Sequence, residues 1–499
     1  MPGDVSARVR IDLGQQWAAE LDRYTAVLGR LHKTMDNDKK WEGYWWLPGN
    51  ESQSVPGTLT YAESRIVLET LGPLTEGWAR TGGTIDAIVG VSAEGKNITL
   101  VNCRSQGGRM SFPGIERQKY SARLLAVNVH LASEDELTLG QFSFRCTDLS
   151  VWVGRSGFSV ESNYSDRSYQ INYQLPEPIE AAILDGMTFT VDFSAEGPSG
   201  EWLAKSMTIS ETEWMCISTQ EELPFMQLYK TATRIRDFLT LAIGRPVFIT
   251  HMLGRSDRAR VNTNEHGSYY RDIELYPAHQ AHTSSRHSVW SPEKVLLPLA
   301  DVEPRLGGIL SSWVERAVLL EPVMDLYFGT LYEPTVHLQR HFLLLSQAIE
   351  TYHRRTSDAT DLPEPQHTAR MNAVLDSVPS EYRIWLRQRL HYSNELSLRQ
   401  RIKDLVQWFQ PILSGFIETK AFVNVVVDTR NYLTHYDPTL KAKAATDLDL
   451  LDLIYKLRTL LEICFLREVG LDDDIINRVM AKQIEERSYI VAVNRPKSA

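Results

Sequence analysis

The chain has 499 residues, of which 43% are hydrophobic and 23% charged, and its formal net charge is −10 at pH 7. Its length exceeds what one hydrophobic core usually serves, which predicts two or three domains, and its negative charge argues against a protein that coats nucleic acid through bulk electrostatics. No apolar run approaches the roughly 18 residues that cross a bilayer, and residues 1–17 lack the apolar core of a signal peptide, so we expect a soluble, cytoplasmic protein without a membrane partner.

The acidic residues are concentrated in the first two thirds of the chain. Residues 335–499 contain 22 Lys/Arg and 21 Asp/Glu, whereas residues 1–334 contain 31 and 42. The last third is therefore the part that can approach a polyanion without a large electrostatic penalty. The four cysteines are far apart and form no CxxC pair, which predicts buried thiols and neither a disulfide framework nor a zinc site.

The first part of the chain is predicted to be rich in β-strands. After a predicted helix at about 14–33, residues 42–220 contain short runs such as TIDAIVGVS and QFSFRC, which are separated by Gly, Pro, Asn, Asp or Ser. Because little helix separates these strands, we expect them to be antiparallel, in a β-sandwich or a curled sheet. A helix at about 225–243, ended by Gly244, and two more strands complete this part.

A change of hydrophobic period marks the second part. Residues 277–294 are polar and aperiodic, which places a domain boundary there and predicts domains at 1–285 and 295–499. From about residue 305 the period becomes helical, and one apolar stripe is formed by Leu338, Phe342, Leu345, Ile349 and Tyr352. The predicted fold class is α+β, with an antiparallel, sandwich-like β-rich domain followed by an all-α helical bundle.

Three features of the first part resemble binding sites but have simpler explanations. Residues 90–97, GVSAEGKN, approach a phosphate-binding loop, but Asn97 follows Lys96 where such a loop needs Ser or Thr, so a hairpin turn is predicted. The three histidines of residues 278–287 lie in an irregular segment without cysteines, so no metal site is predicted. The tryptophans of WEGYWWLPG, residues 41–49, can form an aromatic ligand platform, although core or edge packing is the commoner role.

The segment 428–438, DTRNYLTHYDP, places an arginine and a histidine at the end of an apolar helix. Metal-independent RNA cleavage needs a base for the 2′-hydroxyl proton, an acid for the departing 5′-oxygen and a cation for the charge on phosphorus; histidine and arginine suit these tasks. Three other Arg/His pairs have a similar spacing, namely Arg123/His130, Arg245/His251 and Arg260/His266. Those three fall in predicted strands or a polar loop, so only Arg430 and His435 lie on a helix of the bundle.

The same helix is predicted to be amphipathic. On an ideal helix its polar line is Asn424, Asp428, Asn431 and His435, opposite an apolar side of Phe422, Val426, Leu433 and Tyr436. Such a line can border a cleft or only face water. Arg430 lies about 140° around an ideal helix from His435. Joint action therefore requires a distorted last turn, an arginine side chain that wraps around the helix, or groups from a second subunit.

The pattern Arg-Asn-x-x-x-His on a late helix, after an earlier helix reading FLLLSQAIETYHRR, resembles the HEPN superfamily and in particular the ApeA-type proteins of bacterial anti-phage defence. The first part, with GYWWLP at 43–48 and GTLTYAESRIVLETLG at 57–72, is similar to the N-terminal domain that accompanies this HEPN module. The resemblance implies an endoribonuclease that needs no metal or cofactor, cleaves tRNA to stop translation during infection, and forms a homodimer through the HEPN domain.

The resemblance also implies roles for individual residues. Arg430 would stabilise the phosphate, His435 would act as base or acid, and Asn431 would be the polar residue that often follows the arginine. Glu350, at the place where related families carry an acid on the earlier helix, would orient His435 or Arg430; an exposed helix glutamate is the alternative. His353, one turn further on, is a weaker candidate.

A basic segment at 383–403 is a candidate for RNA binding. It contains one acid, Glu395, and six basic residues: Arg383, Arg387, Arg389, Arg399, Arg401 and Lys403. Trp385, His391 and Tyr392 are interleaved, a pattern compatible with phosphate contacts and base stacking. A solvated basic helix face is the alternative.

One further interpretation concerns the whole protein, and another concerns its first part. A non-catalytic HEPN-like module would bind RNA, a nucleotide or a protein partner, but such a module would be expected to lose Arg430, Asn431 or His435, and all three are present. Because an unrestrained ribonuclease would kill its host, residues 1–285 are predicted to restrain the bundle until they sense a phage product such as a protein. Carbohydrate binding by this part rests on fold analogy alone.

Overall fold

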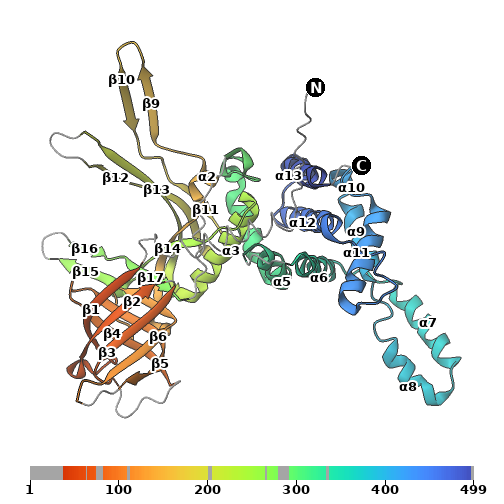
Figure 1. Cartoon of the computed structure of the whole chain (residues 1–499), viewed down its shortest axis with the longest axis horizontal. Helices are drawn as coiled ribbons and strands as arrows, with labels where there is room; N and C mark the ends of the chain where they lie inside the picture. The colour runs from red at the N-terminus through yellow and green to blue at the C-terminus, as the bar shows by residue number, and fades with distance from the viewer. Residues whose placement is uncertain are drawn as a thin grey trace, which may run out of the picture.

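The computed structural model describes residues 38–62, 64–74, 83–109, 113–199, 205–263, 267–278, 292–332 and 337–495. Antiparallel strands form the first part and helices the second, as predicted (Figure 1). The helix expected at 14–33 and the histidines of 278–287 lie outside the described residues. No helix among the described residues is long and apolar enough to cross a membrane.

Six strands form a closed sheet, in the order β4 (Thr84–Ser92), β1 (Lys39–Trp46), β2 (Val55–Ala62), β3 (Arg65–Leu71), β6 (Arg117–Ala122) and β5 (Asn97–Arg109). The long strand β5 pairs with both β4 and β6, which closes the sheet. The interior is a separate apolar core that contains Trp45. Trp45 crosses β4 at Gly90, where an added Cβ would lie 2.4 Å from the indole. Glycine is therefore required at this crossing.

Two predictions for the closed sheet are confirmed. Trp41, Trp45 and Trp46 are buried, with at most 7% of each exposed, so they pack in the core and form no exposed platform. The segment at 90–97 is a hairpin turn between β4 and β5, in which the Gly95 N–H donates to the Ser92 carbonyl oxygen at 2.8 Å.

The sheet continues beyond the closed part as one curled layer, the second of the two forms expected. Its remaining strands are β7 (Leu124–Val127), β17 (Ile273–Pro277), β14 (Ile249–Arg255), β8 (Thr138–Cys146), β13 (Thr208–Pro224), β12 (Thr188–Ser199) and β11 (Ile179–Ala182). Two separate hairpins are β9 (Phe158–Asn163) with β10 (Ser168–Tyr173), and β15 (Arg260–Thr263) with β16 (Gly267–Tyr270).

Helix α3 (Phe225–Ile243) connects the sheet to the helical part. It has the predicted bounds and ends at Gly244, whose φ of 84° favours glycine. One side of α3 packs on β8 and β13, and another packs on α5 (Leu306–Tyr332). The short helix α2 (Leu149–Val153) lies beside it and also contacts α4 (Leu299–Val302).

The helical part is a bundle of α5, α6 (Leu338–Thr356), α9 (Leu398–Trp408), α10 (Gln410–Leu413), α11 (Thr419–His435), α12 (Asp447–Glu468) and α13 (Asp473–Asn494). Helix α6 is central, since it packs on α5, α9, α11 and α12. The predicted stripe of α6 is confirmed: Phe342, Leu345, Ile349 and Tyr352 are buried, and Leu338 packs at the edge of the core. Helices α7 (Glu364–Asp376) and α8 (Ser380–Arg389) form a hairpin that projects from the bundle (Figure 1).

One hydrophobic core runs from the outer sheet through α3 and α5 into the bundle. At the α3–α5 contact the Trp313 indole N–H donates to the Arg234 carbonyl oxygen at 2.6 Å. Arg458 of α12 donates to the carbonyl oxygen of Gly244 at 3.3 Å. The sheet and the bundle are therefore joined by buried apolar and polar contacts.

Candidate active site on α11

Helix α11 is fixed at both ends by its own sequence. At its start the Glu418 carboxylate accepts hydrogen bonds from the N–H groups of Lys420 and Ala421 at 3.1 and 2.6 Å. At its end Tyr436 adopts a left-handed conformation with φ of 53°, directly before Asp437-Pro438. The predicted helix and its stop are confirmed.

The two faces of α11 follow the predicted division, with one exception. Phe422 and Val426 are buried and Leu433 packs against the core. Tyr436 was expected on the apolar side but is 67% exposed. Since it is the first residue beyond the helix and has left-handed dihedrals, its side chain leaves the helical periodicity.

His435 lies in the last turn of α11 and is exposed. No described residue forms a hydrogen bond with its imidazole, although Asp437 is close enough to interact electrostatically. The imidazole of His435 can therefore be reached by a substrate.

Arg430 is half-buried one turn earlier, and its guanidinium donates to the side-chain oxygen of Asn431 at 3.3 Å. No carboxylate among the described residues forms an ion pair with it. The helix is regular up to His435, because the Tyr436 N–H donates to the Tyr432 carbonyl oxygen in the ordinary i to i−4 manner. A distorted last turn is therefore excluded as the means of bringing Arg430 and His435 together.

Part of the polar line of α11 is buried or hydrogen-bonded within the bundle. Asn424 accepts a hydrogen bond from Arg399 of α9, so its amide oxygen is used within the bundle. Asp428 and Asn431 are half-buried. The accessible end of the line is therefore its C-terminal end, where His435 lies.

The loop after α11 carries two lysines that sequence reasoning missed. The Thr429 hydroxyl accepts a hydrogen bond from the Ala445 N–H at 2.9 Å, which holds the end of this loop against α11. Lys441 and Lys443 lie within the loop and are exposed. The basic run KAK directly after the helix stop was the available signal.

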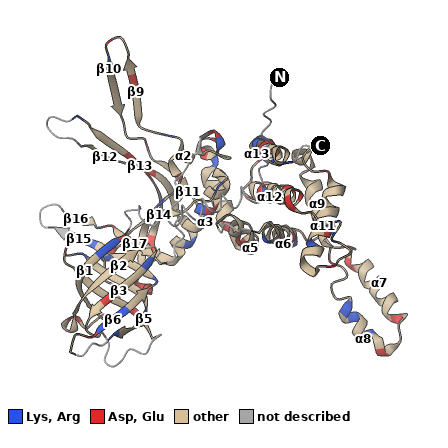
Figure 2. Cartoon of the chain, in the orientation of Figure 1, with Lys and Arg blue, Asp and Glu red and all other residues tan. Residues whose placement is uncertain are grey.

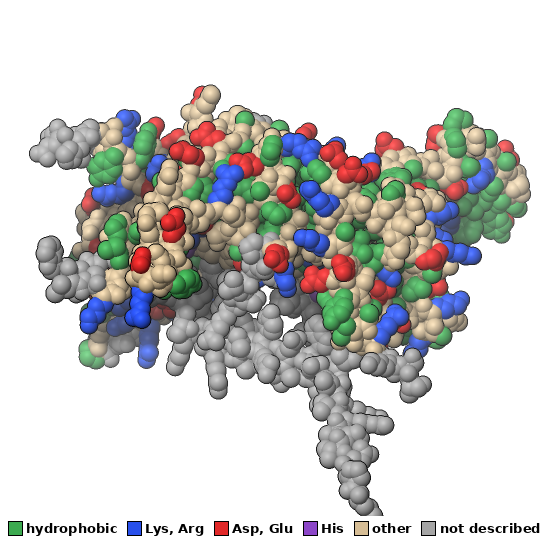
Figure 3. Space-filling view, turned by 90° about the horizontal axis from the view of Figure 1, so that it is seen from above, with side chains coloured by type: hydrophobic (Ala, Val, Ile, Leu, Met, Phe, Trp, Pro, Cys, Tyr) green, Lys and Arg blue, Asp and Glu red, His purple; other side chains and the backbone are tan. Residues whose placement is uncertain are grey.

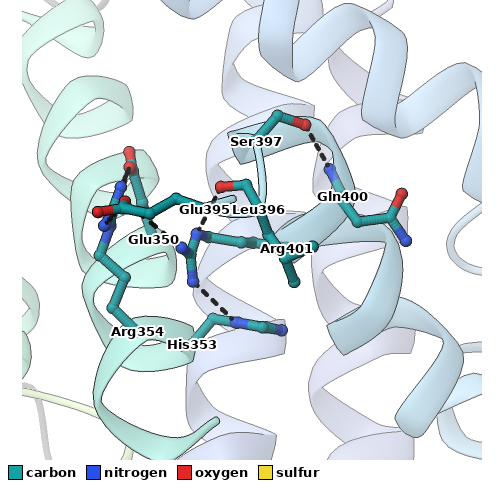
Figure 4. Close-up of polar contacts among 8 residues, drawn as sticks. All are labelled: Glu350, His353, Arg354, Glu395, Leu396, Ser397, Gln400 and Arg401. Carbon is teal, nitrogen blue, oxygen red and sulfur yellow. Dashed lines mark hydrogen bonds and ion pairs between the residues drawn. The ribbon is translucent and has the colours of Figure 1, made fainter. Parts of the chain in front are cut away.

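Glu350 belongs to a polar cluster between α6 and α9 rather than to α11 (Figure 4). Its carboxylate accepts two hydrogen bonds from Arg354, at 3.3 and 3.1 Å, and Arg354 also binds Glu395. No described contact joins Glu350 to Arg430 or His435. Within one chain the expectation that Glu350 orients either residue is therefore not supported.

His353 and Arg401 form the buried part of that cluster. One guanidinium nitrogen of Arg401 lies 3.2 Å from Nδ1 of His353, and another donates to the Leu396 carbonyl oxygen at 3.0 Å (Figure 4). Nε2 of His353 lies 3.5 Å from the Asp404 carboxylate, and its ring stacks on Trp408. Burial, followed by the charge of Arg401, lowers the pKa of His353, so the fold favours the neutral imidazole.

The predicted RNA-binding residues divide into an exposed group and one buried residue. The exposed group is Arg383, Arg387, Arg389, Arg399 and Lys403. The ribbon of α8 is blue at Lys or Arg positions in Figure 2, and Figure 3 shows basic and hydrophobic side chains at the end of the molecule where α7 and α8 lie. The prediction is wrong for Arg401, which is 4% exposed and positions His353 and the start of α9 instead.

Other residues of types that often act in catalysis or metal binding have structural roles here. Arg245 forms a bidentate ion pair with Asp148, and His130 contacts the Gly90 carbonyl oxygen at 2.9 Å. All four cysteines are unpaired and buried. Within the described residues, no group of three or more His, Cys, Asp and Glu side chains is arranged to hold a metal ion.

The fold and the position of α11 define a protein with a β-rich first part and a HEPN-type bundle. Residues 40–313 match the family ApeA N-terminal domain 1, and residues 343–475 match the family Apea-like HEPN. The chain belongs to the ApeA-type HEPN proteins, a nuclease family of anti-phage defence. No curated protein and no solved structure matches the chain.

Proposed function

We propose that this protein is a metal-independent endoribonuclease that acts in the cytoplasm and cleaves tRNA in response to a phage. The proposal rests on the surroundings of two side chains within the residues that match the Apea-like HEPN family. Arg430 is a cation without a carboxylate partner among the described residues, and His435, on the same helix, is exposed. A phosphate would complete the ionic environment of Arg430.

The chemistry divides between these residues as follows. His435 takes the proton from the 2′-hydroxyl or gives one to the departing 5′-oxygen, and Arg430 stabilises the charge that develops on phosphorus. Asn431 holds the guanidinium of Arg430 through their hydrogen bond. One chain places a single histidine on α11, whereas the reaction uses both a base and an acid. A homodimer that brings two copies of α11 to one cleft supplies the second histidine.

Substrate capture is assigned to exposed basic groups on α8 and in the loop after α11. Arg383, Arg387 and Arg389 lie on or beside the projecting hairpin of α7 and α8, and Trp385 is 57% exposed among them. Lys441 and Lys443 follow His435. Arginines with exposed aromatic side chains suit a folded RNA that has unpaired bases, such as tRNA.

Regulation is assigned to the first part, residues 1–285, which restrains the bundle of residues 295–499 until a phage protein binds. The support is the continuous core and the buried α3–α5 contact, because a change in the sheet can reach α6 and α11 through packed helices.

The proposal is tested by RNA cleavage in EDTA with the full chain and its His435→Ala and Arg430→Ala variants. Each substitution should reduce cleavage by about 10²–10⁴-fold, the usual contribution of a positioned proton-transfer group. Thr434→Ala, an exposed neighbour on the same turn, is the matched control. Undiminished cleavage in both variants would contradict the proposal. RNA binding without cleavage under any trigger would instead establish the non-catalytic module.

A further inference from the structure

A cavity of about 130 Å³ lies where the closed sheet meets the outer sheet. Its lining comes from five strands, β1, β2, β13, β14 and β17, and includes Lys39, Tyr61, Trp214, His251, Glu274 and Tyr276. It is remote in the fold from α11, which belongs to the bundle (Figure 1). Nothing assigned above to RNA cleavage uses it.

The strand pairing explains why a cavity exists at this point. Strands β14 and β17 pair only at Leu253↔Glu274 and Gly254↔Ile273. Beyond these pairs β14 continues along β8 as far as Ile249, while β17 continues along β7 as far as Pro277. The two strands therefore diverge, and side chains from the closed sheet form the far wall of the space between them.

Aromatic side chains form the walls. The rings of Tyr61 and Tyr276 are 5.1 Å apart, and the ring of Trp214 contacts His251 edge-on at 6.3 Å. A cavity of this volume is close to the roughly 150 Å³ that accommodates a benzene ring in an engineered protein core. The space therefore fits one planar ring, with the rest of a ligand outside the mouth.

The polar groups around the cavity are predominantly cationic. Lys39 and Lys96 lie 3.2 and 3.5 Å from the same carboxylate, Glu274, so two ammonium groups share one negative charge. The guanidinium of Arg145 lies 5.6 Å from the centre of the Trp214 ring, and the Glu213 carboxylate is close enough to interact with it electrostatically. This local excess of positive charge stands in the acidic two thirds of the chain.

Arg145 belongs to a row of side chains on one face of the sheet. Arg145 of β8 is opposite His251 of β14, and it follows Phe144, whose partner Met215 follows Trp214 on β13. Directly opposite residues in an antiparallel sheet project from the same face. The Arg145 guanidinium therefore lies between two of the residues that line the cavity.

We propose that this cavity is a nucleotide-binding site, with the base between Trp214 and the two tyrosines and the phosphate at Lys39 and Arg145. Glu274 accepts hydrogen bonds from the base edge. A planar ring packs against the aromatic walls, and an anion neutralises the excess positive charge. A nucleotide carries both groups on one small molecule, whether free or at the end of a single strand.

The test is calorimetric titration of the full chain carrying His435→Ala, which prevents cleavage of RNA probes. The probes are AMP, GMP, CMP and UMP, a single-stranded RNA tetranucleotide, and inorganic phosphate. At least one mononucleotide should bind, with a dissociation constant below about 1 mM. Lys39→Gln and Trp214→Ala should each weaken binding at least tenfold. Lys40→Gln is the matched control, because Lys40 is the next residue on β1 and pairs with Glu42 instead.

Each outcome decides the question. Binding of the tetranucleotide alone, lost in Lys39→Gln, would identify a strand end as the source of the nucleotide. Absence of binding by every nucleotide probe would overturn the site, as would equal losses in Lys39→Gln and Lys40→Gln. Phosphate binding as tight as nucleotide binding would overturn recognition of the base. If Trp214→Ala does not fold, Lys39→Gln still decides the outcome.

Discussion

The guanidinium of Arg401 contacts Nδ1 of His353 at 3.2 Å inside the bundle, where 4% of Arg401 and none of His353 is exposed. Since the arginine is the donor, Nδ1 of His353 accepts and the proton of the neutral ring is on Nε2, toward Asp404. The contact joins α6 to α9, and α9 in turn binds α11 through Arg399 and Asn424. It therefore supports the helix that carries Arg430 and His435.

This contact predicts that acid destabilises the bundle. Because burial and Arg401 lower the pKa of His353 below its ordinary 6.5, the folded state binds fewer protons than the unfolded state when the pH falls below 6.5. The stabilisation is thus complete above pH 6.5 and is lost as the pH falls through the lower, folded-state pKa. The melting temperature of the full chain should fall between pH 7.5 and pH 5.5.

The matched variants for this prediction are His353→Gln and His367→Gln. His353→Gln should cost about 1–3 kcal/mol at neutral pH, the usual cost of disturbing a buried hydrogen bond, and should flatten the pH dependence. His367 is half-buried on α7 and its ring contacts the Ser393 hydroxyl at 3.0 Å, outside the α6–α9 cluster, so its replacement should change both quantities much less. An identical pH profile in wild type and His353→Gln would contradict the assignment.

The projecting hairpin predicts a measurable stacking contribution to RNA binding. Trp385→Ala should weaken tRNA binding by about 1–3 kcal/mol, measured by fluorescence anisotropy in the His435→Ala chain. Tyr489→Ala is the control, because Tyr489 is 67% exposed but lies on α13. Arg387→Gln should also reduce the salt dependence of binding, as expected when one phosphate contact is lost. Equal losses in Trp385→Ala and Tyr489→Ala would show that the hairpin has no special part in capture.

The α3–α5 contact predicts where restraint of the bundle is transmitted. Arg234 of α3 donates from its side chain to the Val314 carbonyl oxygen of α5 at 3.2 Å, in a half-buried position. Arg234→Gln should loosen this contact and raise toxicity in uninfected cells. Lys230→Gln is the control, since Lys230 joins the same two helices through an exposed pair with Glu321. A chain with Arg234→Gln that is no more toxic than wild type would place the restraint elsewhere.

The helices were predictable because each carries a local apolar stripe. Apolar residues that recur with a period of 3.6 identify α3, α6 and α11 without knowledge of the helices that pack against them. The closed sheet was not predictable, because β5 pairs with β4, β6 and β7, and such long-range pairings leave no local signal beyond alternation. The strands were therefore predicted correctly, whereas the closure of the sheet was not predicted.

Arg401 shows how composition can mislead within a correctly predicted helix. It was grouped with surface arginines because its segment is basic. Its position, however, falls in the stripe formed by Leu398, Ile402 and Leu405, which is the face that packs on α6. His353 likewise follows Tyr352 in the stripe of α6. A polar residue inside an apolar stripe was the signal for a buried pair.

The regular end of α11 yields the sharpest prediction for the active site. Because Arg430 and His435 diverge by about 140° on an undistorted helix, we expect Arg430 of one chain to act with His435 of a second. Chains with Arg430→Ala and chains with His435→Ala should each be inactive, but a mixture refolded or co-expressed together should recover cleavage. A mixed dimer would hold one intact arginine and one intact histidine in the shared cleft, so it lacks one of the two proton-transfer groups and should recover cleavage only in part. If each chain acted alone, no chain in the mixture would contain both groups, and cleavage would stay absent. The control is a mixture of His435→Ala with a chain that lacks both side chains, which contains no intact histidine and should remain inactive.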